Sequence, residues 1–511
     1  MGDGKFRVFK KKSENVIDIK KYLYSLLIPT LLFLVAFIWK YNYIDQRDIS
    51  LDEPFTIFHA QMSLAEIIRL PAKNEPNPPL FMMILHFWIK LFGISAHSVR
   101  IVPIFFNALT TVFLYFTGKR FFNLQSGLTA SLLFIFSTYH FFFGADTRTY
   151  SMLSLATAGS LYYLMALQQN PEKKINLAGL IISNIVLVYG HYFGWFVIFI
   201  QFMVTFFYPG NRQFIKKSIL AIATTTALYL PMFSILFKQF MISKKATWVT
   251  PPPASEFVQQ LKWFINSGTG LRVLIYILIA GVIFTIVTKQ KRGQIKDVAL
   301  VLVWWLVPYT IMFFASSKIP MFTNRYILFN SVGFYLFIGV TVNYLFGKIK
   351  FISIAASLIL LWMAYTRMFT GDFAPRKVKE TTDFIRTKAD STSTIIIYAH
   401  WADWEFMYYY DQEIFKEVDK YENQLEKNRI YRAWGLDDTQ LYLEENKPQK
   451  VIFYQNNTAA IDPQNSLFNY IDSAYTRTDS VPFDGGLVVS IFTKSKPDSV
   501  LMENNILTTP K

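Results

Sequence analysis

The sequence predicts a polytopic α-helical membrane protein with about eleven spans, followed by a small extracytoplasmic α/β domain at the C-terminus. Three observations predict this fold class. Apolar residues make up 52% of the 511 residues and recur in runs long enough to cross a bilayer as helices. Lysine and arginine gather in the loops that would face the cytoplasm. After residue 369 the long runs stop, and short β-branched and amphipathic segments alternate.

The expected spans follow the apolar runs in order. The run at 78–92 is short and carries His86 and Lys90, so we expect a helix lying on the membrane surface there. An odd number of spans places the C-terminus outside if the N-terminus is cytoplasmic, as the lysines before the first run predict: Lys10, Lys11, Lys12, Lys20 and Lys21. The expected spans are 23–41, 101–117, 127–143, 152–167, 175–189, 196–208, 219–237, 271–288, 298–314, 327–346 and 352–368.

Charge divides the chain in the same way. Residues 1–366 contain 34 basic and 13 acidic residues, a net charge of +21, whereas residues 367–511 contain 17 and 22, a net charge of −5. The cations lie at the ends of expected spans, which is the pattern of a protein in the cytoplasmic (inner) membrane and argues against nucleic-acid binding. The absence of cysteine excludes thiol catalysis and disulfides.

The C-terminal segment has the pattern of a small α/β domain. We expect helices at 378–387 and 402–410, and strands at 394–398, 450–454 and 486–493. The predicted domains are therefore a membrane domain at 1–369, whose first outer loop at 44–100 carries catalytic residues, and a soluble domain at 370–511.

An acidic pair in the first outer loop is the strongest candidate for chemistry. Asp52 and Glu53 stand in the stretch Leu51-Asp52-Glu53-Pro54-Phe55-Thr56, where one carboxylate could instead cap a surface helix that begins at Pro54. No carboxylate lies within an expected span, which argues against a proton-coupled transporter. The acids expected outside are Asp45, Asp48, Asp52, Glu53, Glu66, Glu75, Asp146 and Glu256.

Several short motifs, in this order, resemble membrane glycosyltransferases of the C superfamily, and more narrowly the bacterial relatives of protein O-mannosyltransferases and the lipid A aminoarabinose transferase. The first outer loop supplies Leu51 to Thr56, then Asn77-Pro78-Pro79-Leu80 and Ser98-Val99-Arg100. The later outer turns supply Ala145-Asp146-Thr147-Arg148-Thr149-Tyr150, His191-Tyr192-Phe193-Gly194 and Asn324-Arg325-Tyr326.

The resemblance implies transfer of a sugar, with inversion, from a polyprenyl-phosphate-linked donor to an acceptor on the outer face of the membrane. Asp52 would take the acceptor proton, and Glu53 would orient the acceptor or hold a metal. Asp146 is the second candidate acid. The remaining candidates would bind the donor phosphate (Lys318, Arg325, Tyr326 and Arg148) or contact donor or acceptor (His86, His191 and Tyr192).

Some alternatives stay open at this point. One alternative is a non-enzymatic flippase or transporter of lipid-linked sugars. Another is a polysaccharide ligase or polymerase, which would also use a lipid-linked donor. The acceptor is a lipid, a glycan or a protein. A carboxylate pair at 52–53 suits Mg²⁺ or Mn²⁺ as well as it suits a base, so a cofactor is not fixed. The arginines at 148 and 325 could simply contact phospholipid headgroups.

Overall fold

The chain packs as two compact units in the computed structural model, which describes residues 14–73, 75–207, 210–245, 249–289, 295–369 and 376–494. One unit, here the helical unit, comprises Met1–Ile44 and Ser63–Asp372; the other, the C-terminal unit, comprises Asp45–Met62 and Phe373–Lys511. The predicted domain boundary at 370 and the lysines predicted to face the cytoplasm at 10–12 lie outside the described residues.

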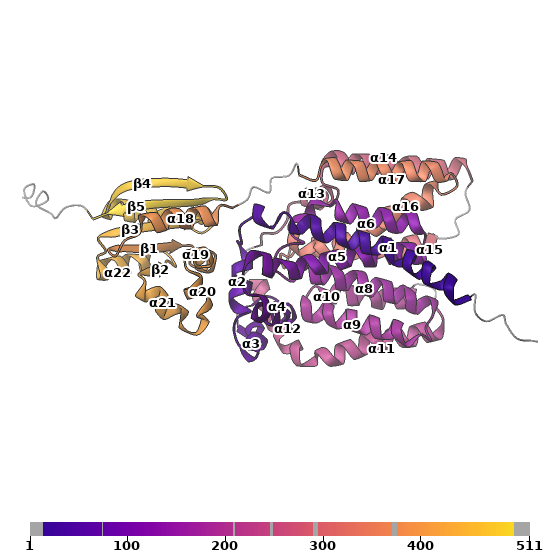
Figure 1. Cartoon of the computed structure of the whole chain (residues 1–511), viewed down its shortest axis with the longest axis horizontal. Helices are drawn as coiled ribbons and strands as arrows, with labels where there is room; N and C mark the ends of the chain where they lie inside the picture. Colours follow the sequence, from indigo (N-terminus) through magenta and orange to yellow (C-terminus); the bar gives the residue numbers. More distant parts are fainter. Residues whose placement is uncertain are drawn as a thin grey trace, which may run out of the picture. The chain divides into compact units, whose positions relative to one another are not determined.

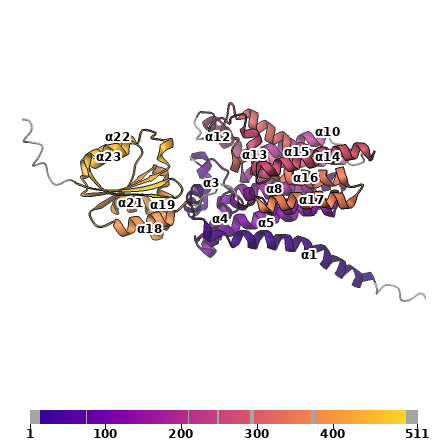
Figure 2. The same ribbon diagram turned by 90° about the horizontal axis from the view of Figure 1, so that it is seen from above.

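The helical unit is a bundle of long apolar helices that run roughly alongside one another (Figures 1 and 2). Its hydrophobic core lies between α5, α6, α8, α9, α15 and α16. The helices are α1 (Glu14–Tyr41), α3 (Leu64–Lys73), α4 (Leu80–Phe92), α5 (Ala96–Phe121), α6 (Leu124–Ile135), α7 (Thr138–Phe142), α8 (Tyr150–Gln169), α9 (Lys174–Gly190), α10 (Gly194–Phe207), α11 (Arg212–Tyr229), η2 (Leu230–Met232), α12 (Phe233–Lys245), α13 (Glu256–Phe264), α14 (Gly268–Val287), α15 (Ile295–Ala315), η3 (Asn324–Ile327), α16 (Leu328–Phe346) and α17 (Lys350–Thr366).

Each of the eleven ranges predicted to span the membrane overlaps a helix of this unit. Among the described residues, 6 segments are long and apolar enough to cross a bilayer, judged by length and composition. They are Leu26–Gln46, Ala96–Phe121, Arg212–Ile242, Gly268–Val287, Ile295–Ala315 and Asn324–Phe346. The chain is thus a multi-helix membrane protein, and the number of eleven spans stays a prediction. The range 78–92 contains helix α4, as predicted, and its place on the membrane surface stays a prediction.

The predicted span at 127–143 is wrong in one respect, because its helix is interrupted. α6 ends at Ile135 and α7 begins at Thr138. Asn266 supplies the missing backbone partners: its Oδ1 accepts from the Thr138 N–H at 2.8 Å, and its Nδ2 donates to the Phe136 carbonyl at 2.7 Å. Ser137 caps α7 by accepting from the His140 N–H. Free backbone groups inside a bundle are tolerated where such side chains satisfy them.

Two glycines allow α5 and α6 to approach closely. A Cβ atom at Gly127 would lie 2.5 Å from the carbonyl oxygen of Tyr115, and a Cβ at Gly118 would collide with the Gly127 backbone. Close backbone approach through small residues is how membrane helices gain packing energy, since lipid is as apolar as their side chains.

We expect Gly127→Ala to lower the thermal stability of the detergent-solubilised protein, because the added methyl group must push two helix backbones apart. Overpacking of this kind costs about 1–3 kcal/mol. Gly268→Ala is the matched control, since its Cβ would meet no atom closer than 3.6 Å. Thermal unfolding of both variants beside the parent measures the difference, and equal midpoints would show that the contact relaxes without cost.

The C-terminal unit is built on a five-stranded mixed sheet with strand order β2-β1-β3-β5-β4. β2, β1 and β3 are parallel, and β5 and β4 add on in antiparallel fashion. The strands are β1 (Ser393–Tyr398), β2 (Ile430–Arg432), β3 (Lys450–Asn456), β4 (Thr476–Phe483) and β5 (Leu487–Thr493). The helices are α18 (Val378–Lys388), η4 (His400–Ala402), α19 (Asp403–Tyr410), α20 (Gln412–Lys416), η5 (Val418–Lys420), α21 (Tyr421–Lys427), α22 (Leu436–Asn446), η6 (Thr458–Ala460) and α23 (Ser466–Ala474).

Helices cover both faces of this sheet, so the predicted small α/β domain is present. α22 and α23 lie on one face, and α18, α19 and α21 lie on the other (Figure 2). Leu443, Leu467 and Ile471 pack with Phe453 on the first face, and Phe406 packs against Tyr454 on the second. β1 is buried along its whole length, as expected for a parallel strand covered on both sides.

The start of the first predicted outer loop packs into this C-terminal unit. Residues Asp45–Met62 contain η1 (Ile44–Gln46) in part and α2 (Asp52–His59). Phe55 and Phe58 lie 5.1 and 5.9 Å from the indole of Trp404, and Phe58 also contacts Phe415 at 5.5 Å, between ring centroids. This differs from the predicted grouping with the membrane domain, because aromatic burial against α19 and α20 joins the segment to residues far along the chain.

Candidate active site

Three of the predicted site residues, Arg148, His191 and Tyr326, gather at one end of the helical unit. Arg148 stands just before α8, and the Thr149 hydroxyl donates to the Gly190 carbonyl at 2.7 Å, which ties the start of α8 to the end of α9. His191 follows directly, and its ring lies 6.0 Å from that of Tyr326 in η3. Tyr150 lies 6.2 and 6.4 Å from the same two rings. We call Arg148, Tyr150, His191 and Tyr326 the α8–α9 cluster.

Arg148, the cation of this cluster, forms an ion pair with Glu75, an acid that is not part of any of the sequence motifs. The Arg148 guanidinium lies 3.8 Å from Glu75, and both side chains are buried. Glu75 Oε1 also accepts from the backbone N–H and the Nδ2 of Asn77, at 3.0 and 2.8 Å. The only available signal was that Glu75 stands two residues before the Asn77-Pro78-Pro79 motif.

His191 presents a hydrogen-bond donor to the cluster. Its Nδ1 accepts from the Phe193 N–H at 3.1 Å, so the proton of the neutral ring is on Nε2. That Nε2 is buried and has no hydrogen-bond partner among the residues that the structure describes. The Tyr192 hydroxyl is also buried and also has no hydrogen-bond partner among the described residues. Buried polar groups are normally satisfied, so two unsatisfied donors side by side in sequence indicate a place for a ligand.

An apolar groove begins at the same turn. It has a volume of about 350 Å³ and is lined by Tyr192, Trp195, Phe196, Phe199 and Ile311 from α10, α15 and the turn before α10. Apart from the polar atoms of Tyr192 and Trp195, this lining is hydrocarbon. A groove of this kind suits a long aliphatic chain whose polar end reaches residues 191–192.

The contacts of the other predicted site residues in the helical unit do not by themselves assign a role to them. Arg325 is half-buried, with Cζ 5.8 Å from the ring of Tyr326, whereas Lys318 is exposed beyond the end of α15. Asp146 lies in the turn before α8 and accepts from the Arg148 N–H at 2.6 Å through its backbone oxygen. His86 is buried on α4, 5.4 Å from the ring of Phe87. The roles proposed for these four stay predictions.

Asp52 and Glu53 belong to the C-terminal unit, where they occupy a tight turn. The Glu53 N–H donates to the Ser50 carbonyl at 3.2 Å, which places Leu51 and Asp52 at the two centre positions. Leu51 has φ 58° and ψ −118°, a conformation that belongs to the first centre position of a type II′ turn and normally requires glycine. α2 begins at Asp52, so the N-cap position falls on Leu51 and neither acid occupies it.

Glu405 of α19 holds this strained turn. Its carboxylate accepts from the Leu51 N–H. It is itself paired with Arg376, at 3.1 Å between Oε1 and Nε, and accepts from Asn456 Nδ2 at 2.8 Å. Burial raises the pKa of the Glu405 carboxyl, and the Arg376 charge opposes that rise. Close by, the Tyr409 hydroxyl accepts from the Ile49 N–H at 2.5 Å.

Glu53 is buried and lies 3.9 Å from Arg47, whereas Asp52 is only half-buried. The two neighbouring acids therefore differ: Glu53 is held within the segment, and Asp52 is the one that keeps access to solvent. Among the described residues, no group of three or more His, Cys, Asp or Glu side chains is placed to hold a metal. Metal dependence therefore stays an untested expectation.

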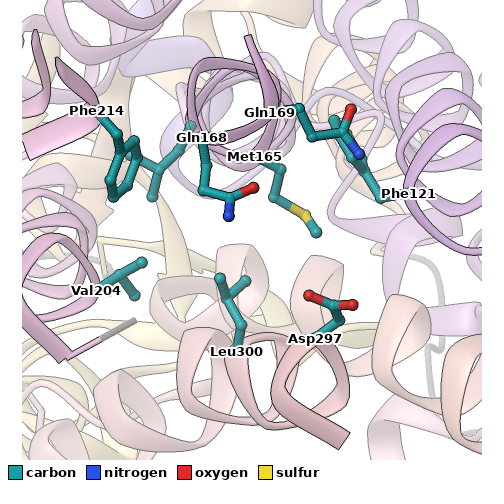
Figure 3. Close-up of a pocket in the computed structure, with 9 residues that line it drawn as sticks. Phe121, Met165, Gln168, Gln169, Val204, Phe214, Asp297 and Leu300 are labelled. Carbon is teal, nitrogen blue, oxygen red and sulfur yellow. The ribbon is translucent and has the colours of Figure 1, made fainter. Parts of the chain in front are cut away.

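A second cavity, of about 40 Å³, lies at the other end of α8. Figure 3 shows Asp297 of α15 across this cavity from Gln168 and Gln169. These glutamines are 18 and 19 residues along α8 from Tyr150, a distance of about 27 Å at the helical rise. The cavity is too small for a sugar and is separate from the α8–α9 cluster.

Comparison with known proteins identifies the fold. Residues 76–237 match the family model of dolichyl-phosphate-mannose-protein mannosyltransferases. The structure superposes on ArnT from Cupriavidus metallidurans bound to undecaprenyl phosphate with a TM-score of 0.56 and 11% sequence identity, over 91% of this chain and 97% of that one. The fold is that of the C superfamily of membrane glycosyltransferases, GT-C. AglB, an oligosaccharyltransferase of Archaeoglobus fulgidus, in complex with an inhibitory peptide and a dolichol-phosphate, also superposes on this chain. The TM-score is 0.52 at 8% identity, over 93% of this chain and 75% of that one.

The region matched by the family model covers some of the candidate site residues. No curated protein matches the chain. The matched region contains Asp146, Arg148, His191 and Tyr192, whereas Asp52 and Tyr326 lie outside it. The predicted resemblance to GT-C membrane glycosyltransferases is confirmed, and the comparisons indicate glycosyl transfer.

Proposed function

We propose that the protein is an inverting glycosyltransferase that moves a sugar from a polyprenyl-phosphate-linked donor to an acceptor on the outer face of the cytoplasmic membrane. The observation that carries this proposal is the buried α8–α9 cluster, in which the Arg148 cation and the unsatisfied His191 Nε2–H lie together in a GT-C fold. ArnT bound to undecaprenyl phosphate and AglB in complex with dolichol-phosphate have the same fold, which supports a lipid phosphate as the donor carrier.

The cluster suits a leaving phosphate. As the bond between the anomeric carbon and the phosphate oxygen breaks, negative charge grows on that oxygen, and groups placed beforehand stabilise it most effectively. Arg148 supplies a charged donor and His191 a neutral one. Glu75 keeps the guanidinium in place through the ion pair described above. The groove that begins at Tyr192 provides an apolar surface for the polyprenyl tail.

The attacking acceptor hydroxyl needs a base to take its proton. The acceptor hydroxyl attacks the anomeric carbon from the face away from the phosphate, and its proton passes to a carboxylate, for which we assign Asp52. One carbon–oxygen bond forms while the other breaks, so the products are the glycosylated acceptor with inverted configuration and the free polyprenyl phosphate. The reaction needs no covalent enzyme intermediate.

The test is sugar transfer in sealed vesicles of known orientation, with radiolabelled sugars on polyprenyl monophosphate and, separately, on polyprenyl diphosphate. The proposal expects labelled acceptor on the face that carries the C-terminal unit, with stoichiometric release of polyprenyl phosphate from the first donor or polyprenyl diphosphate from the second. Movement of the intact donor across the membrane without release of the sugar would contradict the proposal and favour a flippase.

We expect Arg148→Gln to lower kcat/KM for the lipid-linked donor about 10- to 100-fold, the usual cost of a lost charged hydrogen bond to a phosphate. Arg148→Lys should fall in between, because it keeps a charge opposite Glu75 but loses the planar fork. Arg272→Gln, an exposed arginine on α14, is the matched control. Donor titrations of the three purified variants measure the effect, and equal values for Arg148→Gln and the control would remove Arg148 from the site.

A further inference from the structure

Two tryptophans of the C-terminal unit are exposed, although each closely follows a strand of the sheet. Trp401 follows β1 and is 51% exposed; Trp434 follows β2 and is 67% exposed. Large aromatic side chains normally contribute to the core, and a pair left outside it indicates a binding surface. Trp404, by contrast, packs against Phe55 and Phe58 of α2.

A histidine joins the two indoles into one surface. The ring of His400 is stacked on Trp434, with centroids 3.5 Å apart and planes within 17°, and lies 4.8 Å from the ring of Trp401. We call His400, Trp401 and Trp434 the aromatic platform. It lies at the carboxyl ends of two adjacent parallel strands, the edge where open α/β sheets bind ligands.

Hydrogen bonds fix both loops that carry the aromatic platform. Asp438 accepts from the Trp434 N–H at 3.0 Å and from the Tyr431 hydroxyl at 2.8 Å. Asp403, at the start of α19, forms an ion pair with Arg432 at the end of β2, with 3.3 Å between Asp403 Oδ2 and Arg432 Nη1. Burial raises the pKa of Asp403 to about 7, while Arg432 opposes that rise. The platform is therefore preorganised, which reduces the entropy cost of binding.

The aromatic platform and the Asp52 turn meet the same end of α19. Trp401 precedes Glu405 by four residues, about one helical turn, and Glu405 accepts the hydrogen bond from Leu51, the neighbour of Asp52. A molecule resting on the platform would thus lie close to the carboxylate to which we assign acceptor deprotonation.

We propose that the aromatic platform is a subsite for a pyranose ring of the acceptor, so that the acceptor is a glycan or glycolipid. The C–H groups on one face of a pyranose carry partial positive charge and suit the negative face of an indole. Asp438, which accepts from the Trp434 N–H, favours neutral or amino-substituted sugars over anionic ones. The role as acceptor subsite rests on the proposed function, whereas sugar binding itself does not.

A membrane surface is the competing occupant, since exposed tryptophans also lie in the headgroup region of bilayers. Charge argues against it here. Residues 367–511 have a net charge of −5, and Asp437 and Asp438 follow Trp434 in the sequence. Anionic lipid attracts basic segments and repels a surface of this sign.

The test is saturation-transfer NMR on the full-length protein in nanodiscs, without donor, using cellotetraose, mannotetraose and chitotetraose as probes. We expect saturable binding of at least one probe. Binding should weaken at least tenfold in Trp401→Ala and in Trp434→Ala, and recover in part in Trp434→Phe. Leu441→Ala, which removes another exposed apolar side chain from the same unit, is the control and should bind normally.

Binding and catalysis can then be separated. In transfer assays with the bound sugar as acceptor, Trp434→Ala should raise the acceptor KM at least tenfold with little change in kcat. If binding depends on both tryptophans but the parent transfers no sugar to any acceptor, the platform stands and the proposed function fails. The platform is overturned if no probe binds the parent, or if both alanine variants bind the probes normally.

Discussion

Asp52→Asn should reduce sugar transfer at least 100-fold while leaving folding and donor binding intact. Loss of a general base typically costs 10²- to 10⁴-fold in rate, because the acceptor hydroxyl must then lose its proton to water. The substitution is nearly isosteric, and the turn bond that surrounds Asp52, from the Glu53 N–H to the Ser50 carbonyl, involves only backbone atoms. Transfer assays should therefore show a lower kcat at an unchanged donor KM.

Two further variants make this prediction specific to the position. Asp45→Asn changes an exposed acid in the same segment and should leave activity unchanged. Glu53→Gln removes the partner of Arg47, so we expect it to loosen the segment rather than to remove the base. If Asp52→Asn transfers sugar at the parental rate, the acidic pair only anchors the loop and the assignment of the base is wrong.

The sequence was sufficient to predict features that depend on local pattern. Apolar runs of sufficient length appear as helices throughout the helical unit, and the β-branched run at 394–398 is the buried strand β1. Arg148, His191 and Tyr326 were predicted from separate motifs. In the structure the bond from Thr149 to Gly190 joins the helix ends next to Arg148 and His191, and the ring of Tyr326 lies 6.0 Å from that of His191. Their roles remain to be tested.

Features that depend on distant partners were not predictable in this way. Glu75 was one outer acid among eight until the structure placed it 3.8 Å from Arg148. The packing of Asp45–Met62 with the C-terminal unit depends on contacts such as that of Ile49 with Tyr409, 360 positions apart. No local periodicity reports such a contact.

Two strands were also missed, for different reasons. β2 has only 3 residues, too few to show a pattern. β4 is an edge strand without a buried residue, so it lacks the apolar alternation that marks a strand. The turn between β4 and β5 does have a sequence signal, because Asp484-Gly485-Gly486 stands just before β5. In the structure both glycines have positive φ, as hairpin turns require.

Glu405→Gln should lower kcat about 10- to 100-fold although Glu405 touches no substrate in the proposed reaction. Leu51 holds a conformation that costs a non-glycine residue about 1–3 kcal/mol, and such strain persists only where the surroundings enforce it. Here the enforcing contact is the bond from the Leu51 N–H to a carboxylate charged through Arg376. With a neutral amide in its place, the turn relaxes and Asp52 spends less time in the reactive position. Assays at saturating donor, together with hydrogen exchange of residues 45–62, measure both consequences.

A positioning role can be distinguished from a general loss of stability by relieving the strain at its source. Glycine adopts φ 58° and ψ −118° without cost, so Leu51→Gly should restore much of the activity that Glu405→Gln removes. A variant that merely unfolds the C-terminal unit would not be rescued, because glycine at position 51 adds no contact. If the double variant is as inactive as Glu405→Gln alone while exchange at 45–62 is unchanged, the strained turn has no part in catalysis. Recovery would instead show that the C-terminal unit contributes to catalysis by fixing the geometry of a turn that belongs to the first outer loop.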